Sequence, residues 1–114
     1  METKKIFFRE CHLAGRQYYS VNEIWSKLSI GTKLIMERDY ENRYDPAAVM
    51  VKYVDEESGE AYKLGYIPKS DNDGISQLLE MGWGSAFECL ISRLSPTETY
   101  EQQIHLTISV VRKE

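Results

Sequence analysis

The sequence contains little that would support covalent or metal chemistry. It has only two cysteines, two histidines and three prolines among its 114 residues. Cys11 and Cys89 are far apart, and each stands beside apolar residues in a strand-like pattern, which is typical of free buried thiols. His12 and His105 have no cysteine or carboxylate at the spacing of metal ligands. We therefore expect no metal site and no bound cofactor.

The sequence also lacks the motifs of catalysis. It has no glycine-rich phosphate loop, and "GWGS" at 82–85 is typical of a helix end followed by a turn. Neither cysteine has a recognisable base near it in the sequence. Glu37 and Asp39 are paired carboxylates of the kind that acid–base catalysis uses, but at a strand end such pairs are more often solvated surface. We predict that the protein is a binding module and not an enzyme.

Long apolar runs are absent as well. The segment "METKKIFFREC" carries charge, and its apolar stretch is interrupted at Arg9, so it does not resemble a signal peptide. No window of the sequence approaches the length of a membrane span. We expect a cytoplasmic protein that does not bind membranes.

The charge balance excludes an overall basic field. The net charge is −4, which gives no long-range attraction for nucleic acid. Residues 16–69 nevertheless hold eight Lys and Arg against nine Asp and Glu, and four of those nine acids gather in "DEESGE" at 55–60. Without that turn the balance of the segment would be 8 − 5 = +3. A local basic face therefore remains compatible with the acidic total.

Alternation of apolar and polar residues predicts six short strands, which we place at 4–15, 32–39, 47–54, 61–67, 85–94 and 103–111. A helix is expected at 71–81 with Ser70 as its N-cap, and a helical turn or irregular cover at 16–31. This order predicts a mainly β fold, a small OB-like or SH3-like six-stranded barrel with one or two short helices. A chain of 114 residues fits one domain, 1–114, with its core at about 6–112.

The segment 41–53, "ENRYDPAAVMVKY", is the most informative stretch, because a polar turn leads into a strand there. It places Asn42, Tyr44 and Asp45 together, and Tyr66 and Lys69 follow at the end of the next predicted strand. Asn and Asp are common in turns because their side chains bind nearby backbone amides, so the turn alone explains two of the residues. Rings beside cations, however, are also what a single nucleic-acid strand requires, because bases stack on rings while cations meet phosphates.

At these residues the chain resembles the HIRAN domain family. The family pattern contains R-[DE]-x-x-N-x-Y-D-x-x-A-[IV]-x-V followed by G-[YH]-[ILV]-P-[KR]. The corresponding segments here are "LAGRQYY" (13–19), "LSIGTKLIMERDYENRYDPAAVMV" (28–51) and "LGYIPKSDNDGISQLLEMG" (64–82). The resemblance covers nearly the whole chain. It implies a modified OB-type barrel, found fused to chromatin-remodelling helicases or alone in bacteria.

The resemblance also implies a ligand, the 3′ end of single-stranded DNA, which the domain of a helicase-like transcription factor holds. By position, Tyr18 and Tyr44 would stack on the terminal bases, and Lys69 would meet a phosphate. Asp45, helped by Asn42, would accept a hydrogen bond from the free 3′-hydroxyl.

Two positions differ from the domain of the helicase-like transcription factor to which the resemblance points. Tyr66 replaces a histidine and keeps a ring with a polar tip, and Gln17 replaces an arginine, which removes a charge that would meet a phosphate. Arg16 or Arg43 could supply the missing charge. The candidate cations around the pocket as a whole are Lys69, Arg16, Arg43 and Lys63.

Two functions follow from these observations. The first is a module that binds single-stranded DNA ends in DNA repair or processing, with a helicase or nuclease acting in trans because this sequence carries no motif of either. The second is a protein-interaction module that holds a peptide in a groove or on an edge strand. An internal nucleotide lacks the 3′-hydroxyl donor, and a 3′-phosphate would meet the Asp45 carboxylate as a like charge, so one carboxylate would distinguish ends.

Overall fold

The computed structural model describes residues 4–16, 19 and 21–112. Within them, six strands form one antiparallel sheet in the order β1-β6-β5-β2-β3-β4. The strands are β1 (Lys4–His12), β2 (Lys33–Arg38), β3 (Val49–Val54), β4 (Ala61–Tyr66), β5 (Phe87–Leu94) and β6 (Ile104–Arg112). The helices are α1 (Val21–Ile24) and α2 (Asp73–Glu80), with short 3-10 helices η2 (Trp25–Lys27), η3 (Lys69–Asp71), η4 (Gly84–Ala86) and η5 (Tyr100–Gln102).

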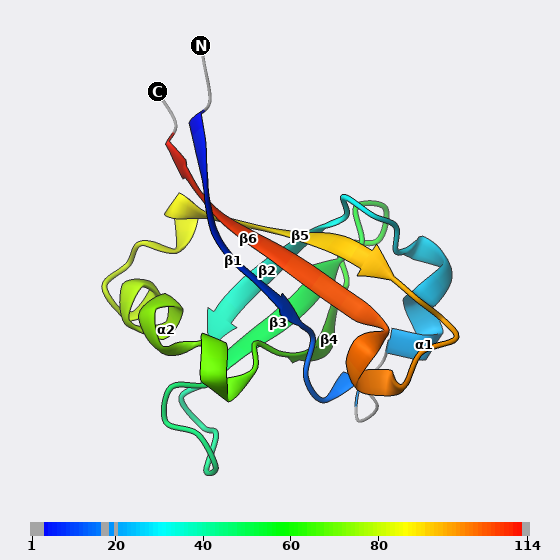
Figure 1. Cartoon of the computed structure of the whole chain (residues 1–114), viewed down its shortest axis with the longest axis horizontal. Helices are drawn as coiled ribbons and strands as arrows, with labels where there is room; N and C mark the ends of the chain where they lie inside the picture. The colour runs from blue at the N-terminus through cyan, green and yellow to red at the C-terminus, as the bar shows by residue number, and fades with distance from the viewer. Residues whose placement is uncertain (1–3, 17–18, 20, 113–114) are drawn as a thin grey trace.

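The sheet folds over itself, so that β1 and β6 cross in front of β2 and β3 in the view of Figure 1. The core lies between the two halves, and it is built mainly from strands such as β6 and β3 whose alternate apolar residues face inward. Ile104, Leu106 and Ile108 from β6 are fully buried, as are Val49 and Val51 from β3. The mainly β prediction is therefore confirmed. The alternation predicted for 103–111 holds from Ile104 to Ile108, whereas at the end of the range Val111 is buried and Val110 only partly so.

The closed barrel that the sequence predicts is wrong. Among the described residues, the edge strands β1 and β4 do not pair along their lengths. The two edges of the sheet meet only at an isolated bridge, in which Ala14 and Tyr66 exchange two backbone hydrogen bonds of 2.9 Å. The reason is local: Gly15, with φ of 73°, turns the chain out of the strand direction immediately after this bridge.

The helix expected at 71–81 is confirmed as α2, but its start differs from the prediction. Ser70 lies in η3, and its hydroxyl contacts the Asp71 carboxylate rather than capping a helix. Asn72 occupies the N-cap position of α2, and its side chain is used elsewhere. The side chains of Cys11 and Cys89 are buried free thiols, as predicted, and burial raises the pKa of each to about 12.

The long loop at 39–48 connects β2 to β3 and hangs below the body of the sheet in Figure 1. It lies at the same end of the molecule as the exit of β4, because β2 and β4 flank β3 on either side and both end at the start of β3. No helix within 4–16, 19 and 21–112 is long and apolar enough to cross a membrane.

The Ala14–Tyr66 bridge depends on the glycine before Tyr66. A Cβ at Gly65 would lie 2.3 Å from the carbonyl oxygen of Ala14, a backbone atom that cannot move without breaking the bridge. We expect Gly65→Ala to lower the free energy of unfolding by about 1–3 kcal/mol, the range for a forced local strain. Urea unfolding measures this loss.

The matched control is Gly74→Ala in α2, where an added Cβ would meet only the Phe8 ring, at 3.7 Å. Alanine is favoured over glycine in helices by about 0.5–1 kcal/mol, so this variant should be as stable as the wild type or slightly more stable. Equal stability of the two variants would contradict the importance of the bridge.

Candidate nucleic-acid interface

The loop at 39–48 is shaped by the side chains that the sequence analysis selected. The Asn42 side-chain oxygen accepts hydrogen bonds from the backbone N–H groups of Tyr44 (2.8 Å) and Asp45 (3.0 Å). Asn42 therefore holds the backbone on which Asp45 stands. Asn42 would therefore contribute to a ligand site indirectly, by fixing the backbone that carries Asp45.

Asp45 has both carboxylate oxygens engaged in the fold. Oδ1 accepts the backbone N–H of Ala47 at 2.9 Å, and Oδ2 accepts the side-chain amide of Asn72 at 2.8 Å. Asn72 is only 2 % exposed, so this second bond is anchored in the interior. The carboxylate is consequently fixed in direction by a buried donor at the start of α2.

Arg38 ties the other side of the loop to the same helix. Its guanidinium donates to the carbonyl oxygens of Ala48 (2.9 Å) and Pro46 (2.9 Å) and to Glu80 Oε1 (2.8 Å). The Arg38 side chain is only 7 % exposed, and it also lies under the Tyr40 ring at 4.7 Å. The loop is therefore held to both ends of α2, through Asn72 and through Glu80.

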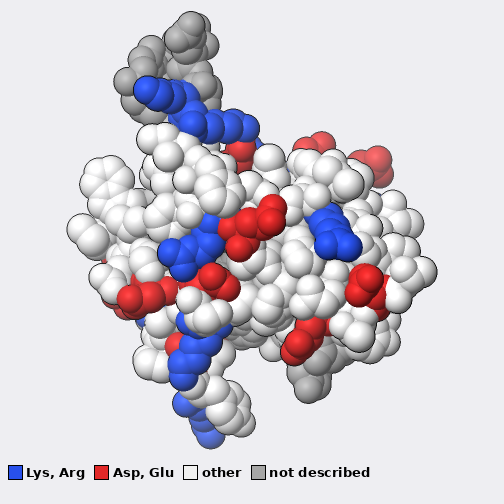
Figure 2. Space-filling model, viewed as in Figure 1, with Lys and Arg blue, Asp and Glu red and all other residues white. Residues whose placement is uncertain are grey.

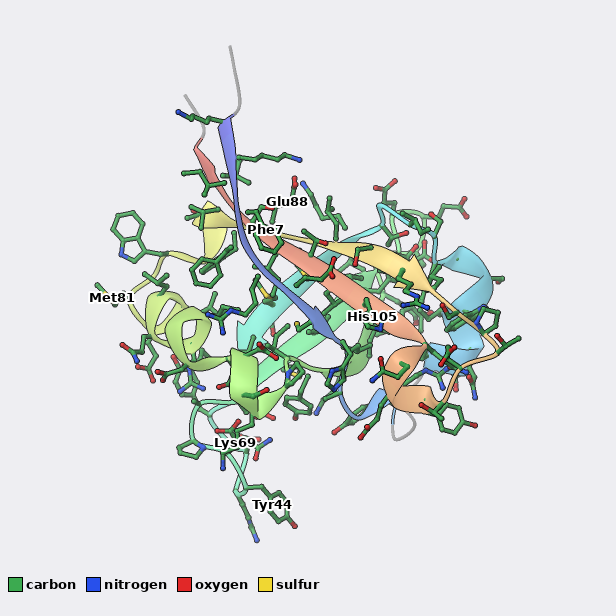
Figure 3. The ribbon with its side chains drawn as sticks, in the orientation of Figure 1. Phe7, Tyr44, Lys69, Met81, Glu88 and His105 are labelled. Carbon is green, nitrogen blue, oxygen red and sulfur yellow. The ribbon has the colours of Figure 1, made fainter. Side chains whose placement is uncertain are left out.

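The tip of the loop presents an unpacked aromatic ring. Tyr44 is 92 % exposed, and Figure 3 shows it projecting from the lower end of the molecule. Lys69, also exposed, lies at the same end in that view, in η3 just after β4. Arg43 beside Tyr44 is exposed too. The fold thus brings Lys69 of η3 to the same end of the molecule as Tyr44 and Asp45, which are neighbours in the 39–48 loop.

A second group of side chains surrounds Tyr66. The Tyr66 hydroxyl donates to Asp39 Oδ2 and accepts a hydrogen bond of 2.7 Å from Lys63 Nζ. The Lys63 ammonium lies 4.5 Å from the centre of the Tyr19 ring and 4.6 Å from that of Tyr66. The two rings are 6.0 Å apart and tilted by 58°. Lysine, two tyrosines and a carboxylate therefore form one connected cluster.

Hydrogen bonds and burial within this cluster shift the pKa values of Asp39, Tyr66 and Lys63. The Tyr66 hydroxyl holds the pKa of the Asp39 carboxyl below its usual value. Burial, and then the Asp39 carboxylate, raises the pKa of Tyr66. Burial opposes the charge of Lys63, but its contacts with Tyr66 and Tyr19 outweigh this effect and raise the pKa of the ammonium. At neutral pH the cluster holds a carboxylate, a neutral phenol and an ammonium.

The side-chain contacts of Arg16 are with residues other than Asp45 and Tyr66. It is 2 % exposed, donates to Asn22 Oδ1 at 2.7 Å, and packs against the rings of Trp25 (5.5 Å) and Tyr100 (4.7 Å). Gln17 and Tyr18, the neighbours that the resemblance selects, lie outside the described residues.

The surface charge is mixed rather than basic. On the face shown in Figure 2, Lys and Arg side chains are separated by acidic and uncharged ones, without a continuous basic band. A cavity of about 600 Å³ lies at the opposite end of β2 and β3, between Lys27, Tyr53 and Asp55. It is not part of the surface around Tyr44. Among the described residues, no cluster of three or more His, Cys, Asp and Glu could hold a metal ion.

Sequence reasoning did not find the contacts that support the site, and it expected Asp39 to be solvated surface, whereas the Asp39 carboxylate accepts a hydrogen bond from the Tyr66 hydroxyl. Arg38 and Asp39 stand in the R-[DE] pair of the family pattern, so a signal for them existed, but it did not say what they contact. Asn72 had no signal beyond its place before a helix. Its partner Asp45 is 27 positions earlier, and only the tertiary fold brings the two side chains together.

The HIRAN domain family model matches residues 6–111. The chain belongs to the HIRAN domain family. Among solved structures, a protein from Lactobacillus plantarum matches this HIRAN domain with a TM-score of 0.78 at 18 % identity, covering 98 % of this chain and 100 % of that one. The HIRAN domain of human HLTF matches with a TM-score of 0.62 at 17 % identity, covering 96 % of this chain and 81 % of that one. No curated protein matches the sequence.

At these identities the two structures support the HIRAN fold and say nothing by themselves about the ligand. Within the sequence, no catalytic domain is evident beside the HIRAN domain. What this domain binds therefore has to be argued from its own side chains.

The Asp45–Asn72 bond can be tested by exchanging its partners. In Asp45→Asn only one of the two side-chain oxygens remains as an acceptor. Either the backbone N–H of Ala47 or the side-chain amide of Asn72 then faces the NH2 group of the new asparagine and has no acceptor. We expect a loss of about 1–3 kcal/mol in the free energy of unfolding, the cost of a buried unsatisfied group. Urea unfolding of the single variant measures it.

The exchange variant, Asp45→Asn with Asn72→Asp, restores a donor opposite an acceptor. Aspartate is also a favourable N-cap, so position 72 at the start of α2 accepts it. We expect the double variant to recover most of the lost stability. A double variant as unstable as the sum of the two singles would show that the bond does not hold the loop.

Proposed function

We propose that this HIRAN domain binds the 3′-hydroxyl end of single-stranded DNA, in a DNA repair or processing context. The observation that carries the proposal is the Asp45 carboxylate, which is fixed in direction by Asn72 and stands next to the exposed ring of Tyr44. The resemblance noted above selects the same two residues for the terminal hydroxyl and the terminal base. The partner would be a DNA end, with a helicase or nuclease acting in trans.

Asp45 retains the capacity to accept a further hydrogen bond. An ionised carboxylate offers about four lone-pair positions, and the fold uses two of them, for Ala47 and Asn72. A 3′-hydroxyl can therefore donate to Asp45 without displacing either bond. A 3′-phosphate is mostly a dianion without a proton to donate at neutral pH, since its second pKa is about 6, and it brings like charge instead.

The rings and cations around the loop suit a few nucleotides rather than a long strand. Tyr44 offers an open face for stacking, whereas Tyr66 is half-buried and fixed by Asp39 and Lys63. Lys69 and Arg43 are exposed and available for phosphates. Arg16 is buried against Trp25 and Tyr100, which favours the other cations for this role.

Replacement of the carboxylate tests end recognition. We expect Asp45→Asn to weaken binding of an oligonucleotide with a free 3′-hydroxyl by roughly 1–3 kcal/mol, the range for a hydrogen bond to a charged group. The preference over a 3′-phosphate oligonucleotide should narrow, because the repulsive charge is gone. Fluorescence titration with both oligonucleotides measures the two quantities.

The exchange variant described above is the matched control. It keeps the 45–72 hydrogen bond but moves the carboxylate to position 72, so it should fold well and still fail to distinguish the two ends. If it distinguishes them as the wild type does, Asp45 serves only to shape the turn before Pro46, and the assignment is wrong.

Tyr44→Ala separates affinity from end recognition. Loss of stacking should cost about 1–3 kcal/mol of binding free energy, with the end preference unchanged. Because Tyr44 is almost fully exposed, the stability of the fold should not change. Tyr40→Ala is the control, since Tyr40 is an exposed ring of the same loop that packs on Arg38. Equal effects of the two variants on DNA binding would argue against stacking at Tyr44.

The salt dependence should be weak. Each phosphate contact on a single strand contributes a slope of about −0.7 in a plot of log K against log salt, so contacts from Lys69 and Arg43 would together give about −1.4. Titrations between low and moderate salt concentrations measure the slope. A value much steeper than about −3 on this scale would require a long basic track, in conflict with the mixed surface charge.

One observation favours the peptide-binding alternative. Strands β2 and β5 pair only at Lys33–Leu90 and Leu34–Cys89, and a cavity of about 270 Å³ lies beyond these pairs. Its lining includes Ile35, Met36 and Phe87. If the wild type binds no oligonucleotide, while a peptide captured from a random-sequence peptide library protects this groove from hydrogen exchange, the interaction module becomes the better function.

A further inference from the structure

Lys63 is placed unlike the other cations around the site. Lys69 and Arg43 are exposed, and Arg16 is buried against Trp25 and Tyr100. Lys63 is half-buried on β4 and contacts both the Tyr19 and the Tyr66 rings, so its ammonium is held in one position. A cation fixed before the ligand arrives loses less conformational freedom on binding than a mobile surface lysine.

The ammonium of Lys63 still has donors to offer. One of its three N–H groups is directed to the Tyr66 hydroxyl at 2.7 Å. The Tyr66 hydroxyl in turn donates to Asp39, so the phenol oxygen stands between the ammonium and the carboxylate. A phosphate oxygen can therefore accept a hydrogen bond from Lys63 while the Tyr66–Asp39 bond stays intact.

The sequence explains why a cation is needed at this place. The resemblance noted above implies an arginine at position 17, where this sequence has Gln17, so one positive charge is missing next to Tyr18 and Tyr19 in the sequence. Lys63 lies over the Tyr19 ring, two positions after Gln17 in the sequence, and supplies a positive charge at that tyrosine. Lysine acts on phosphate as a point charge and does not need the planar geometry of arginine.

We propose that Lys63 is a phosphate-binding cation of this domain and compensates for the glutamine at position 17. This proposal rests on the proposed function, since the phosphate belongs to the bound single strand. Tyr66, fixed by Asp39, positions the ammonium and leaves it open to one phosphate next to the terminal nucleotide.

The test is the salt dependence of binding by a short 3′-hydroxyl oligodeoxynucleotide. In Lys63→Met the slope of log K against log salt should become shallower by about 0.7, because one phosphate contact is lost. Affinity at low salt should fall roughly 10-fold, as for one charge-assisted hydrogen bond. Lys63→Arg should keep the slope, since it retains the charge.

Two further variants separate phosphate binding from support of the fold. Lys33 is an exposed lysine at the start of β2, and its ammonium lies near the Glu88 carboxylate. Lys33→Met should leave the salt slope unchanged. Tyr66→Phe removes the hydroxyl that Lys63 contacts but keeps the cation, so the slope should again be retained. If Lys63 only positioned the Tyr66 hydroxyl, Lys63→Met and Tyr66→Phe would weaken binding equally and neither would change the slope.

The outcomes distinguish this proposal from the proposed function. A wild type that binds 3′-hydroxyl and 3′-phosphate ends equally refutes end recognition, yet a shallower slope in Lys63→Met would still support the phosphate contact. A wild type that prefers the 3′-hydroxyl, with an unchanged slope in Lys63→Met, refutes the role of Lys63 alone. A wild type that binds no single strand overturns both. Urea unfolding of Lys63→Met confirms that a weaker binding signal does not come from unfolded protein.

Discussion

The hydrogen bond between Asp45 and the buried amide of Asn72 is the contact on which the candidate interface depends. A loop of ten residues at 39–48 would otherwise sample many conformations, and its carboxylate would have no fixed direction. Asn72 is buried at the start of α2, and α2 packs its apolar side, with Ile75, on the core. The direction of one half-buried carboxylate is thereby determined by the packing of a helix.

The second tie, from Arg38 to Glu80, acts in the same sense at the other end of α2. Arg38 reaches two loop carbonyls as well, so the loop is connected to the helix on both sides. A rigid loop suits recognition of a chain end, where one hydroxyl must be distinguished from a phosphate, because a mobile carboxylate would accept hydrogen bonds from many donors. The exposed Tyr44 ring needs no such support, since stacking tolerates some freedom.

The acidic net charge and the mixed surface fit this picture. A protein that tracks a long strand needs a continuous basic groove, whereas a protein that holds an end needs few phosphate contacts. The cluster of Lys63, Tyr66 and Asp39 shows how one ammonium can be held beside a carboxylate without forming a direct pair with it, because the phenol lies between them. Affinity would then come from a few fixed contacts and not from a general attraction.

The mainly β architecture, the position of α2 within one or two residues and the family could all be predicted from the sequence. Each of them depends on local features, namely the alternation of apolar residues, the turn residues and a motif of short spacing. The sequence also selected Asn42, Tyr44 and Asp45, since these stand within four positions. It did not determine that the sheet stays open apart from the Ala14–Tyr66 bridge or that Arg16 turns toward Trp25 and Tyr100. Nor did it determine that Asn72 donates to Asp45 or that Lys63 donates to Tyr66. Those outcomes were decided by the tertiary structure, because each depends on side chains from separate segments whose distances only the packing of the core fixes.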